Sequence, residues 1–319
     1  MIGLGEWRCF LAFCVVISHL YNKMVDGPAA YAVWGFYVLS GFLMTFVLNE
    51  KYHFNLTGIK HYTFNRIIRI YPSYLFSLIL GAIAFYVCII SNINPRELNP
   101  QFYMPDNLSG WIVNIFMLFP FDQKSLLVPV ASALYVEIFS YLIMPITARS
   151  KATVWTFAIT SFLANYQFGF GMDTFGQRYS GVATCMFAFS VGSLLYFYKP
   201  LLSRLSFPNL SVVSWIGNCV LWFYFPSYPW TYGLYISVIL SAWVVLSLFN
   251  KNVSNRDKLL GDMSYSVYLL HTTIAAFFAT FLGTERTFLL FFLSFVTVMI
   301  VSYCVVVLIE RKFQRIKFK

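Results

Sequence analysis

Residues 287–309 read TFLLFFLSFVTVMIVSYCVVVLI, an apolar run without a single Asp, Glu, Lys or Arg. A helix needs about 20 mostly apolar residues to cross the hydrocarbon core of a bilayer. The run is long enough for this, and charged residues bound it at Arg286 and Glu310. It therefore predicts a membrane-spanning helix, and other runs of the same kind fill most of the chain.

The composition excludes a protein with an ordinary water-facing surface. Of 319 residues, 59% are hydrophobic, 20% are aromatic and only 11% are charged, whereas soluble domains carry about 25% charged residues. A soluble enzyme, a disordered chain and the usual kind of nucleic-acid binder are therefore excluded. The predicted fold class is an all-α, polytopic membrane bundle.

Ten apolar runs are long enough to be spanning helices. They are residues 7–24, 31–49, 67–90, 126–147, 152–170, 179–198, 212–227, 230–249, 262–282 and 287–309. A further stretch, Trp111 to Phe119, is too short to cross alone and ends at Pro120. We interpret it as a re-entrant or interfacial segment. Residues 1–319 then form one integral-membrane domain without an appended soluble domain.

The positions of Lys and Arg predict the orientation of these helices. With the N-terminus in the cytoplasm, seventeen of the 22 basic residues fall in cytoplasmic segments and five in outside segments. This split follows the positive-inside rule, so both termini are expected inside. The net charge of +10 is thereby explained by membrane topology rather than by nucleic-acid binding.

Arg8 and His19 are two ionisable residues of the first predicted span, where charged or titratable groups are rare and often functional. They are eleven positions apart, which places them about 20° from alignment on one helix face and about 16 Å apart along the axis. Separately, Arg8 has a simpler interpretation as an interfacial anchor and His19 as an interfacial residue. Their shared face favours a joint role.

Arg66 and Arg69 lie three positions apart at the cytoplasmic mouth of the third span, in the stretch RIIRIYP. Two guanidinium groups on one helix face suit a phosphate or pyrophosphate, because each can bind oxygens with two N–H groups. The alternative is a positive-inside anchor. Pro72 would kink or loosen the helix here, and we include its neighbour Tyr71 among the candidate donor-binding residues.

Other polar residues of the predicted spans have weaker interpretations. Glu137 lies in the middle of a span, so its carboxylate must be paired, protonated or exposed to water; a structural partner of an Arg or His is the simplest role. His271 is more easily explained as a satisfied core histidine than as a catalytic one. Asp262 and Glu310 lie at helix ends and are expected to be structural.

The sequence also bears on helix packing and on metal binding. Gly35 and Gly41 are predicted to let helices approach closely. The histidines, at 19, 53, 61 and 271, are scattered, and no HExxH motif or paired-carboxylate motif occurs, so no metal site is expected.

Six stretches that contain these residues resemble acyltransferase family three, the polytopic membrane O-acyltransferases of surface glycans. In chain order they are WRCFLAFCVVISH (7–19), FYVLSGFLMT (36–45), FNRIIRIYP (64–72), ALYVEIFSYLIMP (133–145), GDMSYSVYLLH (261–271) and SYCVVVLIERKF (302–313). Each is weak alone, whereas six in order are specific. Departures from the family pattern occur at Trp7, Ala32 and Trp34.

The resemblance implies a ten-helix core that takes an acyl group, usually acetyl, from cytoplasmic acyl-CoA. By similarity, His19 is the catalytic histidine, Arg8 is its paired arginine, and Arg66 and Arg69 are the pair used for acyl-CoA. Glu137 would orient His19 or balance its charge. Acetyl-CoA is thus expected as donor substrate rather than as a bound cofactor.

The expected function is O-acyl transfer to a sugar hydroxyl of a lipid-linked or surface glycan, such as the O-antigen of a lipopolysaccharide, at the cell inner membrane. The expected partners are acyl-CoA, the glycan acceptor and membrane lipids, and no nucleic acid. The alternatives are a transporter or flippase of a lipid-linked glycan or small solute, a glycan polymerase or glycosyltransferase, and a non-catalytic scaffold. A transporter would use intramembrane Arg, His and Glu as a substrate or proton path.

Overall fold

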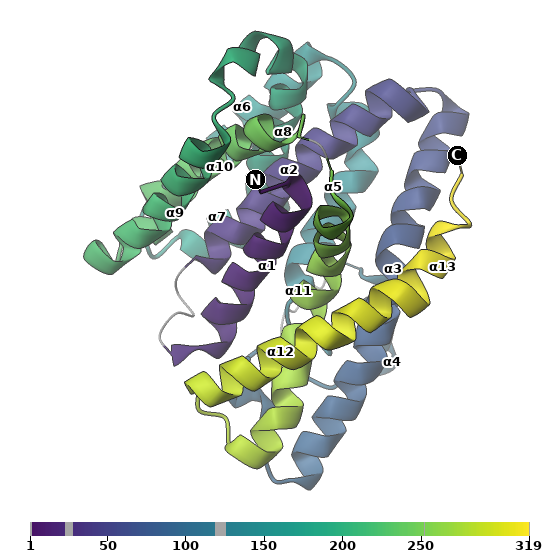
Figure 1. Ribbon diagram of the computed structural model, residues 1–319, viewed down its shortest axis with the longest axis vertical. Helices are drawn as coiled ribbons and strands as arrows, with labels where there is room; N and C mark the ends of the chain where they lie inside the picture. The colour runs from purple at the N-terminus through teal and green to yellow at the C-terminus, as the bar shows by residue number, and fades with distance from the viewer. Residues whose placement is uncertain (1, 23–27, 119–125, 252, 319) are drawn as a thin grey trace. The chain divides into compact units, whose positions relative to one another are not determined.

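The computed structural model describes residues 2–22, 28–118, 126–251 and 253–318. Within these ranges the chain is helical and forms no β-strand, which confirms the all-α fold class (Figure 1). The main helices are α1 (Leu4–Leu20), α2 (Ala29–Val47), α3 (Leu56–Ile90), α4 (Leu108–Phe116), α5 (Ala131–Thr147), α6 (Lys151–Phe168), α7 (Phe175–Ser180), α8 (Val182–Leu202), α9 (Pro208–Tyr224), α10 (Tyr232–Leu248), α11 (Asn255–Leu282) and α12 (Phe288–Val305). Shorter elements are η2 (Leu48–Tyr52), η3 (Pro95–Glu97), η4 (Ser203–Leu205), η5 (Tyr228–Trp230), η6 (Val306–Glu310) and α13 (Arg311–Gln314).

Each of the ten predicted apolar runs overlaps a helix, and five helical segments of the described chain are long and apolar enough to cross a membrane. These segments are Ala29–Tyr52, Leu56–Ile90, Val182–Leu205, Asn255–Leu282 and Phe288–Gln314. Helices α1, α5, α9 and α10 have 17 residues each, a rise of about 26 Å. The protein is therefore a membrane protein with several spanning helices, whereas the count of ten and the orientation of the termini stay predictions.

The short stretch before Pro120 forms α4, a helix of nine residues. Asn107 begins it by accepting a hydrogen bond from the Gly110 N–H, and Met117 ends it in the left-handed region with φ 49°. Nine residues rise only about 14 Å, so α4 is too short to span a bilayer, as predicted. Pro120 itself lies outside the described residues.

The chain folds into two compact units, each built from three separate parts of the sequence. Unit 1 comprises residues 1–11, 30–64 and 136–258, and unit 2 comprises residues 12–29, 65–135 and 259–319. Each unit is described by itself below.

Close contact between α2 and α8 holds unit 1 together. A Cβ at Gly41 would overlap with the carbonyl oxygen of Phe189, and a Cβ at Gly192 would overlap with that of Val38. The two backbones therefore touch, and the Thr45 hydroxyl donates a 2.8 Å hydrogen bond to Ser193 across the same contact. The close approach predicted for Gly41 is confirmed, and Gly192 is its partner on α8.

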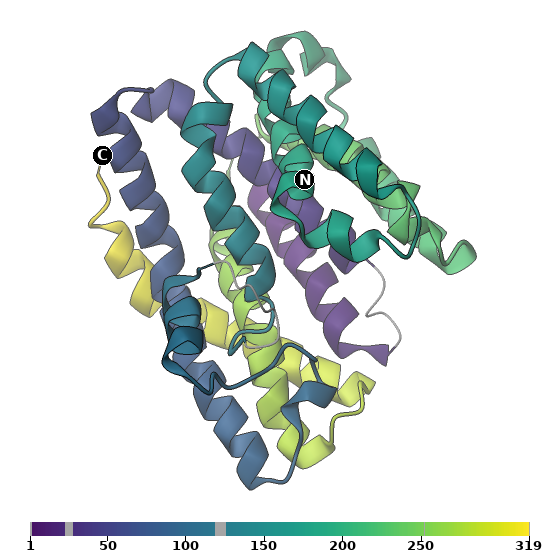
Figure 2. The same ribbon diagram turned by 180° about the vertical axis from the view of Figure 1, so that it is seen from behind.

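The remaining helices of unit 1 pack as pairs. Helix α6 lies along α8 (Figure 2), and α9 lies along α10 (Figure 1). Polar side chains bind across both pairs: Asn165 of α6 donates to the Thr184 carbonyl at 3.0 Å, and the Trp215 indole of α9 donates to Ser241 at 2.9 Å. Such satisfied hydrogen bonds join apolar helices without leaving polar groups unpaired in the bilayer.

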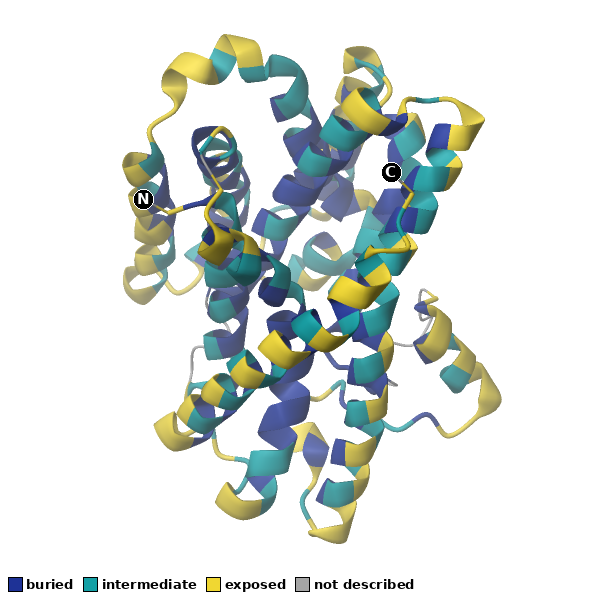
Figure 3. Cartoon of the chain, turned by 45° about the vertical axis from the view of Figure 1, so that its right-hand side comes forward, coloured by how far each residue is buried: buried dark blue, intermediate teal, exposed yellow. Residues whose placement is uncertain are grey.

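Helix α12 and the elements that follow it show how unit 2 faces its surroundings. Exposed apolar residues recur every three or four positions along one side of this helix, which leads to the C-terminus in Figure 3. They are Leu289, Phe292, Val296, Ile300 and Tyr303. This spacing is that of a single helix face, and an exposed apolar face of this kind is typical of contact with lipid.

Candidate functional site

Arg69 lies on α3 in an ion-pair network of unit 2. Its guanidinium is 3.0 Å from Glu310 of η6 and 3.3 Å from Asp262 of α11, and the Arg69 and Glu310 side chains are 16% and 2% exposed. The Ser73 and Ser266 hydroxyls also donate to Glu310, at 2.7 and 3.1 Å. A buried carboxylate needs such a set of partners, and the structural role expected for Asp262 and Glu310 is confirmed.

The C-terminal segment adds a third cation beside Arg66 and Arg69. Asn65, next to Arg66, donates to the Phe318 carbonyl at 2.9 Å and accepts from its N–H at 3.0 Å. These two bonds fix the segment on α3 and place Lys317 in the field of both arginines. Burial, together with the charges of Arg69 and Arg66, lowers the pKa of Lys317 to about 8, and Asp262 and Glu310 oppose this shift.

The cluster therefore has three cations and two carboxylates, and it carries a net positive charge. Glu310 and Asp262 hold the Arg69 guanidinium in place. A surplus of positive charge beside fixed guanidinium donors is suited to an anion such as phosphate.

Tyr71 and Pro72 lie one turn further along α3. The Tyr71 hydroxyl donates a 2.7 Å hydrogen bond to the carbonyl of Phe116, the last residue of α4. Tyr74 likewise donates to the Asn114 carbonyl at 2.5 Å. Helix α3 continues through Pro72, and its tyrosines attach α4 to it. The donor-binding role of Tyr71 stays a prediction.

His19 and His271 are neighbours in unit 2. Their ring centroids are 5.2 Å apart and their planes meet at 74°. His19 lies near the C-terminal end of α1, and His271 lies in the middle of α11. His271 is fully buried, and its Nδ1 is 2.7 Å from the Tyr268 carbonyl oxygen. The histidine predicted to be catalytic therefore contacts a second histidine that the sequence interpretation left as a core residue.

Arg8 and Glu137 both belong to unit 1. Arg8 is half-buried on α1, two residues after Glu6, whose N–H donates to Asp257 at 2.8 Å. Glu137 of α5 accepts hydrogen bonds from Ser40 of α2, at 3.0 Å, and from Tyr141. Hydroxyl groups thus satisfy the Glu137 carboxylate, where the sequence suggested a basic partner. The catalytic roles of both residues stay predictions.

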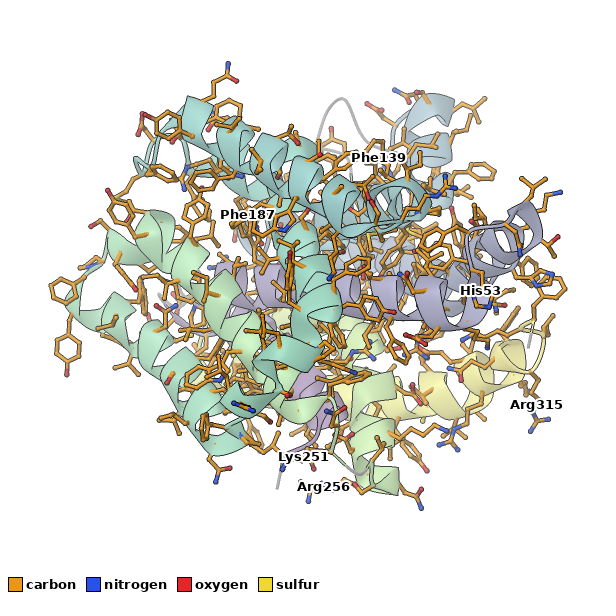
Figure 4. The ribbon with its side chains drawn as sticks, turned by 90° about the horizontal axis from the view of Figure 1, so that it is seen from above. His53, Phe139, Phe187, Lys251, Arg256 and Arg315 are labelled. Carbon is orange, nitrogen blue, oxygen red and sulfur yellow. The ribbon has the colours of Figure 1, made fainter. Side chains whose placement is uncertain are left out.

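Arg256 of α11, which also belongs to unit 1, forms an exposed ion pair. Arg256 is 80% exposed and makes an ion pair of 3.3 Å with Glu6, and Figure 4 labels its side chain. An exposed pair of this kind contributes little to stability. Within the described residues, no group of three His, Cys, Asp or Glu side chains is placed to hold a metal ion.

Two residues of the candidate site carry no strong signal in the sequence. In the sequence, Lys317 is indistinguishable from the other basic residues expected in the cytoplasm. It lies beside the arginines because Asn65 binds the backbone of the neighbouring Phe318. His271 follows His19 by 252 positions, so no local spacing relates them. Contact between helices α1 and α11 within unit 2 brings the two imidazoles together.

Comparison with protein families shows that residues 5–311 match the acyltransferase domain of family three. The match covers nearly the whole chain and includes Arg8, His19, Arg66, Arg69 and Glu137. Searches among curated proteins and among solved structures find no similar protein. The chain belongs to acyltransferase family three and is a membrane acyltransferase.

Proposed function

We propose that the protein transfers an acyl group, in the simplest case acetyl, from cytoplasmic acyl-CoA to a hydroxyl of a lipid-linked or surface glycan. An O-antigen unit at the cell inner membrane is the acceptor we favour. The observation that carries the proposal is His19, a histidine of the predicted first span that packs edge-on against the buried His271. An imidazole away from bulk water is a suitable group for moving a proton in acyl transfer.

His19 acts as the general base in this proposal. It takes the proton of the sugar hydroxyl while the hydroxyl oxygen attacks the thioester carbonyl. A C–O bond forms, the C–S bond breaks, and the CoA thiolate leaves and is protonated. Positioned general-base catalysis contributes roughly 10²- to 10⁴-fold to a rate. A covalent acyl-histidine is the variant of this mechanism in which His19 attacks the thioester first.

The basic cluster on α3 binds the phosphates of the donor. Coenzyme A carries a pyrophosphate and a further phosphate, and its thioester lies at the end of a long, thin pantetheine arm. Arg66 and Lys317 supply cations for these phosphates. Arg69, fixed by Glu310 and Asp262, orients the cluster and adds its remaining donors. Tyr71 holds α4 beside this part of α3.

Arg8 and Glu137 have supporting roles in the proposal. Arg8 balances negative charge that develops on the thioester or on the departing CoA. Glu137, held by the Ser40 and Tyr141 hydroxyls, keeps the supporting role that the family resemblance gives it. Replacing either residue should therefore lower the rate of transfer more than the amount of protein in the membrane.

The test uses purified protein in vesicles, acetyl-CoA labelled in the acetyl group, and a lipid-linked glycan extract. Wild-type protein should release free CoA thiol and pass the label to the glycan. His19→Ala should lose about 10²-fold or more of this rate while its abundance in the membrane stays unchanged. Full activity of this variant would overturn the role of His19.

The same assay separates acyl transfer from transport. A transporter or flippase would move the glycan without consuming acetyl-CoA, so wild-type protein that releases no CoA thiol would overturn the proposed function. Mass spectrometry of the labelled glycan then identifies the acyl group and the modified hydroxyl in one measurement.

A further inference from the structure

The tautomer of His271 follows from its contact with the backbone. Nδ1 lies 2.7 Å from the carbonyl oxygen of Tyr268, three residues earlier on α11. A carbonyl oxygen only accepts hydrogen bonds, so Nδ1 must carry the proton. In the neutral ring the other nitrogen, Nε2, then has a bare lone pair and can only accept.

This lone pair is buried without a donor. His271 is 0% exposed, and its Nε2 has no hydrogen-bond partner among the described residues. Leaving a buried polar atom unsatisfied is unfavourable by about 1–3 kcal/mol. Nδ1 is held by the backbone of α11, so Nε2, across the ring, points away from that backbone. The atom is therefore set to receive a donor from outside its own helix.

His19 is the adjacent group that can supply that donor. The two ring centroids are 5.2 Å apart. Two imidazoles joined nitrogen to nitrogen by a hydrogen bond of about 2.9 Å have a centroid separation of this size. The rings now meet at 74°, so the hydrogen bond requires the His19 ring to turn until one of its N–H groups is directed at Nε2 of His271.

We propose that His271 is a positioning residue for His19, and this inference rests on the proposed function. Nε2 of His271 accepts the N–H of one His19 nitrogen, which leaves the other His19 nitrogen bare and directed at the acceptor hydroxyl. When that nitrogen takes the hydroxyl proton, His19 becomes an imidazolium. Its other N–H still donates to the lone pair on Nε2 of His271. The hydrogen bond to a charged donor is stronger than that to a neutral one, so it favours the step.

Two substitutions separate this role from a structural one. His271→Asn places an amide near the position of Nδ1, so it can keep the bond to the Tyr268 carbonyl but removes the acceptor at Nε2. His271→Gln places its amide near the position of Nε2, so it keeps an acceptor there. We expect His271→Asn to lose at least about 100-fold in acetyl transfer and His271→Gln to retain most of the wild-type rate. Thr273→Val, on the same buried helix, is the control and should leave the rate unchanged.

Every other pattern overturns the inference. A retained rate in His271→Asn with a loss in His271→Gln would assign His271 a structural role through Tyr268. Loss in both variants, with normal abundance in the membrane, would make His271 itself the proton acceptor. Wild-type rates in both would remove it from the reaction. Failure of the wild-type protein to transfer acetyl at all is a different result, since it overturns the proposed function.

A spectroscopic measurement tests the inference without activity. The chain has four histidines, so ¹⁵N-histidine signals of the detergent-solubilised protein can be assigned by single substitutions. We expect His271 to show a protonated Nδ1 and a bare Nε2, and we expect His271→Asn, but not His271→Gln, to shift the His19 tautomer signals. An unchanged His19 signal in His271→Asn would overturn the inference.

Discussion

The Arg69 guanidinium lies 3.0 Å from the carboxylate of Glu310, although 241 positions of sequence separate the two residues. Arg69 also binds Asp262, and Glu310 also accepts from Ser73 and Ser266. One guanidinium therefore joins α3, α11 and η6 within unit 2. The same network fixes the α3 end at which the donor phosphates are proposed to bind.

Replacing Arg69 should strongly destabilise the protein. Arg69→Ala leaves the Glu310 carboxylate, 2% exposed, without its cation, and breaking a buried pair in this way costs about 3–5 kcal/mol. We expect a large fall in thermal stability in detergent and a fall in abundance. The double variant Arg69→Ala with Glu310→Gln should recover much of the loss, because a neutral amide then replaces the buried Glu310 carboxylate. Equal stability of Arg69→Ala and the wild type would contradict the network.

The affinity for acetyl-CoA should decrease as the pH rises, because Lys317 loses its positive charge. Its pKa is lowered from 10.5 to about 8 by burial and by Arg69 and Arg66, while Asp262 and Glu310 oppose this. Below about pH 8 the ammonium is charged and can bind phosphate; above it the charge is lost. KM for acetyl-CoA should therefore rise above this pH, while Lys317→Arg should show a flatter profile.

The same pKa shift also affects stability, but in the opposite direction: the contribution of Lys317 to the free energy of unfolding increases as the pH rises. The unfolded chain holds the Lys317 proton up to about pH 10.5, and the folded chain releases it near pH 8. The unfolded state thus binds more protons in this interval, and the contribution of Lys317 to the free energy of unfolding rises with pH. The test measures the free energy of unfolding of the wild type and of Lys317→Met against pH. A difference, wild type minus variant, that falls between pH 8 and 10 would contradict the lowered pKa of Lys317.

Releasing the C-terminal segment should weaken donor binding. Asn65→Ala removes both hydrogen bonds to Phe318, which are worth about 0.5–1.5 kcal/mol each. Lys317 then loses its fixed position, so KM for acetyl-CoA should rise, and kcat should change little. Combining Asn65→Ala with Lys317→Ala should add nothing to the rise in KM; an additive effect would show that the two residues act separately.

Adding a methyl group at Gly41 should separate α2 from α8. The Cβ of Gly41→Ala would overlap with backbone atoms of Phe189, which cannot move aside as a side chain can. Overpacking of this kind destabilises by about 1–3 kcal/mol. Gly217→Ala on α9 is the matched control, because a Cβ there meets nothing within 4 Å. A loss of stability in the control but not in Gly41→Ala would contradict the packing.

Any substitution that removes the guanidinium group of Arg178 should destabilise the protein. Its side chain is 0% exposed, and it donates to the Gly171 carbonyl at 2.5 Å, the Trp230 carbonyl at 2.6 Å and the Tyr235 hydroxyl at 3.3 Å. Arg178→Lys cannot reach all of these acceptors, and each buried group left unsatisfied costs about 1–3 kcal/mol. Thermal unfolding in detergent should show this loss, whereas Arg256→Lys, at an exposed position, should behave like the wild type.

The sequence by itself determined the features that depend on local composition. Long apolar runs without charge fold as helices in a membrane, because every backbone N–H and C=O must be paired within its own segment there. The apolar run at 287–309 therefore contains helix α12. The short apolar stretch before Pro120 likewise forms a short helix, α4 (Leu108–Phe116). The place of Gly41 at a close contact was also predictable, since small residues serve helix packing in membranes.

Only the tertiary structure decided which ionisable groups meet. Arg69 finds Glu310 and Asp262, Lys317 joins the arginines, and His19 contacts His271. Each of these relationships joins segments that are distant along the chain, so it cannot be predicted from periodicity or local spacing. The physical reason is that a charge or a lone pair inside so apolar a protein must find a partner. Packing of the helices decides which partner is within reach.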